Sequence, residues 1–156
     1  GVCYVPQTNN VFPTLTVQEN LEMGAYIRKD DFRPRLLEIY EMFPPLAEKK
    51  KQAAGELSGG QRQMVAMGKA LMLEPTILML DEPTAGLSPI YRNEIFQIIR
   101  QINASGVPIL MVEQNAKQSL AVANRGYVLV DGRNRTTGKG IDLLNDPEIA
   151  KMFLGG

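Results

Sequence analysis

The residues Ile77-Leu78-Met79-Leu80 form an unbroken apolar run that stops at Asp81-Glu82-Pro83. This run has the length of a β-strand buried on both faces, as in a parallel sheet. A helix should begin at Ser88, and Ile109 to Val112 reads as a second buried strand. A strand, a helix and a strand in this order make a right-handed crossover between parallel strands. The sequence therefore predicts an α/β fold with a parallel sheet.

Further elements extend outward from this crossover. Thr16-Val17-Gln18-Glu19 has the pattern of a helix-starting capping box. Tyr127 to Val130 and Arg133 to Thr137 flank Asp131-Gly132, which predicts a β-hairpin. The other predicted elements are a strand at Val2–Val5, helices over about Arg33–Phe43, Leu57–Met72, Ser88–Ile102 and the residues up to Ala123, and a last helix from Asp146-Pro147 to Phe153-Leu154.

Composition limits the chemistry. The 156 residues, 44% of them apolar, fit one ordinary domain. Seventeen basic and seventeen acidic residues balance, so we expect no nucleic-acid partner. Cys3 is the only cysteine, which excludes an internal disulfide. The absence of histidine excludes a Ser-His-Asp triad, a histidine-bound zinc ion and a histidine general base. No apolar stretch is long enough to cross a bilayer.

Carboxylates follow both strands of the predicted crossover. Asp81-Glu82 and Glu113-Gln114 should lie at the carboxyl edge of the sheet, where open α/β folds place ligands. One carboxylate could support Mg²⁺ while its neighbour deprotonates an attacking water. Equally, Asp81 could cap a turn and Glu82 could face solvent. Spacing alone does not choose between these interpretations.

Ser58-Gly59-Gly60 directly precedes a predicted helix. Glycines let the backbone approach an anion, and a helix N-terminus offers free N–H groups and the positive end of its dipole. The alternative is a turn that needs glycine for its own geometry, with Ser58 as the N-cap. Methionines at helical spacing follow, and we interpret them as core residues.

Together, these motifs resemble those of the ABC-type ATPases, the nucleotide-binding subunits of ABC transporters. Leu57 to Gln61 matches the family's signature, Leu80 to Thr84 its Walker B motif, and Tyr4 to Gln7 its Q-loop. Ala85 to Ser88 matches the D-loop, and Val112 to Gln114 lies at the switch position. The resemblance covers essentially the whole chain. It implies a P-loop NTPase-like ABC ATPase core with a parallel sheet and a helical subdomain.

Three further segments narrow the resemblance. Val112 to Ala116, Ala123 to Leu129 and Phe153 to Gly156 are similar to the ATP-binding subunits of branched-chain amino acid importers. Urea and short-chain amide importers carry nearly the same segments, so they remain an alternative. Two other classes also remain open: ABC ATPases outside transport, and a non-catalytic interaction module.

The resemblance also implies roles for individual residues. In the family, two such domains pair head to tail around two ATP molecules. Asp81 would support Mg²⁺, Glu82 would be the general base, and Gln7 would touch the metal or the attacking water. The residues that would contact the ATP held by the opposite subunit are Ser58, Gly59, Gly60 and Gln61.

The same resemblance divides the chain into three parts. Residues 8–56 would be the Q-loop and the helical subdomain that docks on integral membrane permease subunits. Residues 57–125 would carry the signature, Walker B, D-loop and switch regions, and residues 126–156 the C-terminal hairpin and helices. The implied location is the cytoplasmic face of the plasma membrane.

The chain departs from the family pattern at two points. Gln114 stands where most of the family has histidine, and an amide can donate to a γ-phosphate but cannot carry a proton near neutral pH. In addition, no G-x-x-x-x-G-K-[ST] run occurs in the sequence. We therefore expect an ABC ATPase domain truncated at its N-terminus, which binds ATP poorly and does not hydrolyse it alone.

Overall fold

The computed structural model describes residues 1–153 and divides the chain into two compact units. Unit 1 is Gly1–Val112, and unit 2 is Glu113–Gly156. This division follows contacts within the chain. The three motif-based segments predicted above cut the chain elsewhere, and their boundaries stay predictions.

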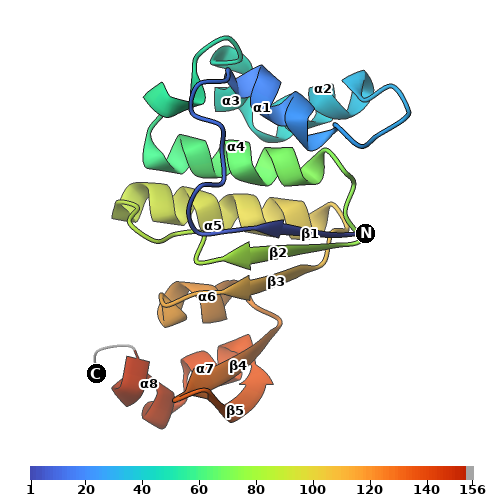
Figure 1. Ribbon diagram of the computed structural model, residues 1–156. Helices are drawn as coiled ribbons and strands as arrows, with labels where there is room; N and C mark the ends of the chain where they lie inside the picture. Colours follow the sequence, from blue (N-terminus) through green and yellow to red (C-terminus); the bar gives the residue numbers. More distant parts are fainter. Residues whose placement is uncertain (154–156) are drawn as a thin grey trace. The chain divides into compact units, whose positions relative to one another are not determined.

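The sheet of unit 1 is parallel, as the crossover pattern predicted. Its strands are β1 (Val2–Val5), β2 (Ile77–Asp81) and β3 (Ile109–Val112), in the order β1-β2-β3. Helix α5 (Pro89–Ala104) connects β2 to β3 (Figure 1). Because β2 is the central strand, its last residue, Asp81, lies between the carboxyl ends of β1 and β3.

The burial of β2 differs from the prediction. Leu78 and Leu80 are 0% and 2% exposed, whereas Ile77, Met79 and Asp81 on the other face are only partly buried. Side chains alternate across a strand, so the helices of unit 1 bury one face of β2 more fully than the other. The uninterrupted apolar run predicted a strand buried on both faces, and that expectation was wrong for the face of Ile77, Met79 and Asp81, which is only partly buried.

Helix α4 (Gly59–Leu71) is the central helix of unit 1 (Figure 1). It packs between α5 and a group of short helices, and it also contacts β1. The group consists of α1 (Val17–Gly24), α2 (Arg33–Met42), α3 (Pro44–Glu48) and the 3₁₀ helix η1 (Ala54–Glu56). Met64 and Met67 are almost fully buried, which confirms that they are core residues.

Local sequence signals account for the start of α1. Thr16 caps the helix, and the Glu19 carboxylate accepts a hydrogen bond from the Thr16 backbone N–H at 2.7 Å, which confirms the capping box. This backbone hydrogen bond holds the pKa of Glu19 below its usual value. One turn later, the fully buried Asn20 side chain bonds the backbone of Phe12, Leu15 and Thr16. The loop before α1 is therefore tied to the helix that follows it.

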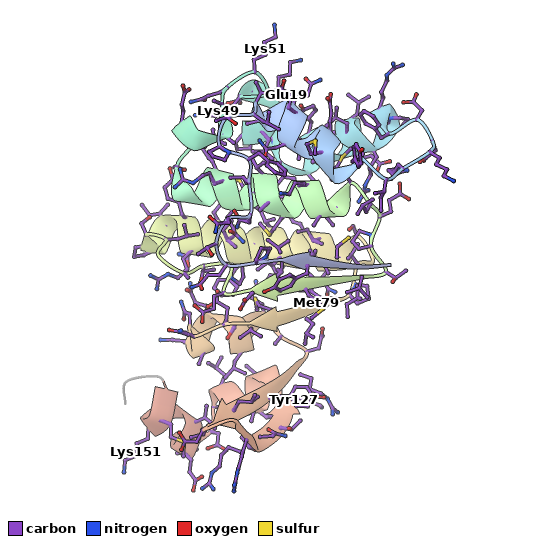
Figure 2. All side chains as sticks on the ribbon, in the orientation of Figure 1. Glu19, Lys49, Lys51, Met79, Tyr127 and Lys151 are labelled. Atoms are coloured by element: carbon purple, nitrogen blue, oxygen red, sulfur yellow. The ribbon has the colours of Figure 1, made fainter. Side chains whose placement is uncertain are left out.

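The lysine run after α3 is mostly exposed. Lys50 and Lys51 are exposed and Lys49 is partly buried, and Figure 2 shows Lys51 extending away from the ribbon. The segment is a turn held by backbone hydrogen bonds to the start of α1.

Unit 2 is a hairpin packed on short helices. Its elements are α6 (Ala116–Val122), β4 (Arg125–Val130), β5 (Arg133–Lys139), α7 (Gly140–Leu144) and α8 (Pro147–Phe153). Asp131 and Gly132 have φ values of 50° and 73°, as a two-residue hairpin turn requires, which confirms the predicted turn. Leu120, Leu143 and Ile149 form the core of this unit.

The C-terminal helix and the lengths of the helices complete the description of the fold. The predicted last helix ends at Phe153, and Leu154 lies outside the described residues. Within residues 1–153, no helix combines the length and the apolar character that a membrane span needs.

Candidate functional site

The chain turns sharply at Glu82, directly after β2. Glu82 has a φ of 44°, in the left-handed region that residues other than glycine seldom adopt. Its backbone N–H still donates to Val112 O at 2.8 Å, so the residue is anchored to β3 while the chain leaves the sheet. Such a conformation costs about 1–2 kcal/mol for a residue with a Cβ. Backbone strain of this kind is characteristic of functional positions.

Gln7 meets Glu82 across the sheet edge. Gln7 follows β1, and its Nε2 donates to Glu82 Oε2 at 2.8 Å. The two residues are 75 positions apart in sequence. The parallel register brings them together, since Val5 pairs with Leu80 and both strands end at the same edge. Two residues that the resemblance assigns to one site are thus in direct contact.

Asp81 is held by a residue of β1 itself. Tyr4 Oη donates to Asp81 Oδ2 at 2.8 Å. This hydrogen bond raises the pKa of Tyr4 above its usual value. Tyr4 belongs to the Q-loop motif, yet its pairing with Asp81 was not predicted, because residue type alone does not reveal a cross-strand partner.

The signature residues begin α4 with a second capping box. The Ser58 hydroxyl accepts from the Gln61 backbone N–H at 3.3 Å, and the Gln61 side chain accepts from the Ser58 N–H at 3.2 Å. The simple alternative, that Ser58 is an N-cap, is therefore realised. It does not exclude anion binding, since the N–H groups of Gly59 and Gly60 have no carbonyl partner inside the helix.

Close packing also explains both glycines. A Cβ at Gly60 would lie 2.7 Å from the ring of Tyr91 on α5, and one at Gly59 would lie 3.1 Å from Leu87. Contacts this short require neighbouring groups to move. The sequence offered turn geometry or anion approach as reasons for glycine here, and packing against the D-loop and α5 is a third.

Several of these residues line one cleft in unit 1. Its volume is about 440 Å³. Among the residues that line it are Gln7, Asn10, Gly59, Gln63, Glu82 and Leu87. The structure thus places Gln7, Gly59 and Glu82, which the resemblance assigns to three different motifs, around a single space.

Hydrogen bonds connect the loop after Gln7 to α4. Asn10 Nδ2 donates to Gln63 Oε1 at 2.9 Å, and Lys69 Nζ donates to Asn10 O at 2.7 Å. Lys69 also lies over the ring of Phe12, 4.8 Å from its centroid, and burial lowers the pKa of Lys69. Sequence reasoning missed Asn10, Gln63 and Lys69, which no local signal marks.

The donors and acceptors of the site fit a phosphate ligand with Mg²⁺. Gln63 is 8% exposed, and its Nε2 has no hydrogen-bond partner among residues 1–153, so a donor remains beside the cleft. Asp81 and Glu82 supply hard carboxylate oxygens. Residues 1–153 contain no cluster of three or more His, Cys, Asp or Glu side chains able to cage a metal. Mg²⁺ is typically bound by one or two carboxylates together with substrate phosphates and water, which such a site can provide.

Gln114 lies in a different unit. It is exposed and sits between the end of β3 and Asn115, the N-cap of α6. Gln114 belongs to unit 2, whereas Glu82 belongs to unit 1. Its assignment to the switch position stays a prediction.

A family model described as ABC transporter matches residues 1–85. The chain belongs to this family. It is 46% identical over its full length to the high-affinity branched-chain amino acid transport ATP-binding protein BraG of Pseudomonas aeruginosa, covering 67% of that protein. It is 42% identical to the probable branched-chain amino acid transport ATP-binding protein LivF of Archaeoglobus fulgidus, covering 66% of it. The chain thus spans about two thirds of these ABC relatives.

Solved structures of ABC cassettes share the fold. An ATP-binding cassette of an ABC transporter in its ADP conformation superposes with a TM-score of 0.83 at 28% identity, over all of this chain and 69% of that one. A nucleotide-free ABC cassette gives 0.81 at 27% identity. The α/β, P-loop NTPase-like ABC ATPase fold predicted from the motifs is confirmed.

Proposed function

We propose that this chain is part of the ATP-binding and ATP-hydrolysing subunit of an ABC importer for branched-chain amino acids. The observation that supports it most is the Gln7–Glu82 hydrogen bond of 2.8 Å, which joins two residues that the resemblance assigns to one site. Similarity to BraG and LivF supports the substrate class. Urea and amide importers and a non-catalytic module remain the alternatives.

In the proposed reaction, the end of β2 supplies the acid–base group. Glu82 accepts a proton from the water that attacks the γ-phosphate. Gln7 donates from its Nε2 to Oε2 of Glu82, and this hydrogen bond orients the carboxylate. When bound, Mg²⁺ neutralises charge on the phosphates, and Asp81 is the carboxylate that would support it.

Residues that bind the partner's ATP lie at the start of α4. Gly59 and Gly60 would present backbone N–H groups to its γ-phosphate, the Ser58 hydroxyl would add a donor, and Gln61 would contact the same nucleotide. A second ABC ATPase subunit, identical or different, is therefore the proposed partner. The short helices between β1 and α4 would dock on permease subunits, at the cytoplasmic face of the membrane.

We test this proposal with the chain alone and with a fusion. The 156-residue chain should neither bind ATP stoichiometrically nor hydrolyse it, because its sequence contains no G-x-x-x-x-G-K-[ST] run. A fusion that places the phosphate-loop region of BraG before residue 1 should hydrolyse ATP and restore leucine uptake to a strain lacking BraG. Stoichiometric ATP binding by the chain alone would contradict the first expectation.

The fusion also separates the alternatives. Hydrolysis with rescue of urea but not leucine uptake would favour the urea importer class, and a folded fusion without hydrolysis would favour the interaction module. In an active fusion, Gln114→Ala should reduce hydrolysis about 10²-fold if its amide stabilises the γ-phosphate. Unchanged hydrolysis would remove Gln114 from the site.

A further inference from the structure

Tyr4 and Asp81 lie on the same face of the sheet. Tyr4 pairs in register with Met79 on β2, and Asp81 is two residues further along that strand. Side chains two apart on a strand share a face, so the Tyr4 hydroxyl reaches diagonally to the carboxylate. The contact is a hydrogen bond of 2.8 Å from Tyr4 Oη to Asp81 Oδ2.

The ring of Tyr4 contributes little to the core. Tyr4 is 55% exposed, whereas its strand neighbour Val5, on the opposite face, is 2% exposed. Apolar burial therefore explains Val5 but not the choice of tyrosine at position 4. What the tyrosine adds to this strand is a hydroxyl within hydrogen-bond distance of Asp81.

The hydrogen bond occupies one carboxylate oxygen and restricts rotation of the group. No residue within 1–153 donates a hydrogen bond to Asp81 Oδ1. A carboxylate with one oxygen held by a protein donor and the other open is the usual arrangement of a metal-supporting side chain with its outer partner.

We propose that Tyr4 is a positioning residue for Asp81, holding Oδ2 so that Oδ1 faces a hydrated divalent cation. This inference rests on the proposed function, which assigns the cation to Asp81. Tyr4 itself touches neither the metal nor the nucleotide.

Mn²⁺ binding to the fusion described above in the presence of ATP, followed by water-proton relaxation, tests the proposal without requiring ATP hydrolysis. The variants are Tyr4→Phe, Asp81→Asn and the control Tyr127→Phe, which removes a hydroxyl from a residue of unit 2 that is 58% exposed. Outer-partner substitutions weaken metal binding about 10- to 100-fold. We expect a loss of about tenfold for Tyr4→Phe, a larger loss for Asp81→Asn and none for Tyr127→Phe.

The outcomes distinguish the positioning role of Tyr4 from the metal-supporting role of Asp81. If Asp81→Asn weakens Mn²⁺ binding and Tyr4→Phe does not, the positioning role is wrong while the metal role of Asp81 survives. If the unmodified fusion with ATP binds no Mn²⁺, or if its Asp81→Asn variant binds Mn²⁺ equally well, the metal role fails and the inference fails with it. Thermal unfolding of Tyr4→Phe should match that of the unmodified fusion, because the fold does not depend on this hydroxyl. A lowered midpoint together with unchanged metal binding would assign Tyr4 a structural role and overturn the proposal.

Discussion

The start of α4 and the end of β2 both carry motif residues, but they differ in how far the fold alone explains them. At α4, Ser58 and Gln61 cap the helix, and Gly60 makes room for Tyr91. At β2, Glu82 adopts a left-handed φ that glycine would accommodate more easily. The strained backbone of Glu82 and the hydrogen bond that its side chain accepts from Gln7 together mark it as a candidate functional residue. The functional argument is therefore stronger at β2 than at α4.

The largest expected effect is that of Glu82→Gln. In a fusion that hydrolyses ATP, this change should reduce hydrolysis by at least 10²-fold, because the amide cannot accept the proton from water. ATP affinity and thermal stability should stay close to those of the parent, since the side chain keeps its shape. Steady-state ATP turnover and nucleotide titration measure the two quantities.

Glu41→Gln on the exposed face of α2 is the matched control, and it should change nothing. Retained hydrolysis in Glu82→Gln would show that the strained residue is not the base. The functional argument would then be no stronger at the end of β2 than at the start of α4.

Gly60→Ala should have the next largest effect. The added methyl would meet the Tyr91 ring at 2.7 Å, and overpacking of this kind costs about 1–3 kcal/mol of unfolding free energy. Urea unfolding of the 156-residue chain measures this loss in the absence of any nucleotide.

A second substitution separates packing from anion binding at this glycine. Tyr91→Ala in the Gly60→Ala background should recover part of the loss, because it removes the group that the methyl meets. If Gly60→Ala left stability unchanged, the glycine would be needed for the ligand alone, and α4 would resemble β2 more closely.

The smallest effect belongs to Ser58→Ala. Loss of an N-cap serine costs about 1 kcal/mol. Ser58→Asp should retain the cap, so urea unfolding should give Ser58→Asp nearly the parental stability and Ser58→Ala a lower one. Equal stability of all three proteins would mean that the capping box contributes nothing, which would leave phosphate contact as the explanation for Ser58.

Much of the fold could be predicted because its signals are local. The capping box at Thr16 and the turn at Asp131-Gly132 depend on residues within a few positions of each other. The parallel crossover from β2 to β3 follows from the order of one strand, one helix and another strand. The uneven burial of β2 could not be predicted, since an apolar run does not record how fully each face will be covered.

The amino-acid sequence by itself thus determined the types of the longer elements, the parallel sheet and the edge at which the carboxylates gather, but it did not predict α3, η1 or α7. Only the tertiary structure decided that Gln7 donates to Glu82, that Tyr4 donates to Asp81 and that Gly60 lies against Tyr91. The physical reason is range. Caps, turns and periodicity are set by neighbours along the chain, whereas contacts between residues as far apart as 75 positions depend on strand register and helix packing.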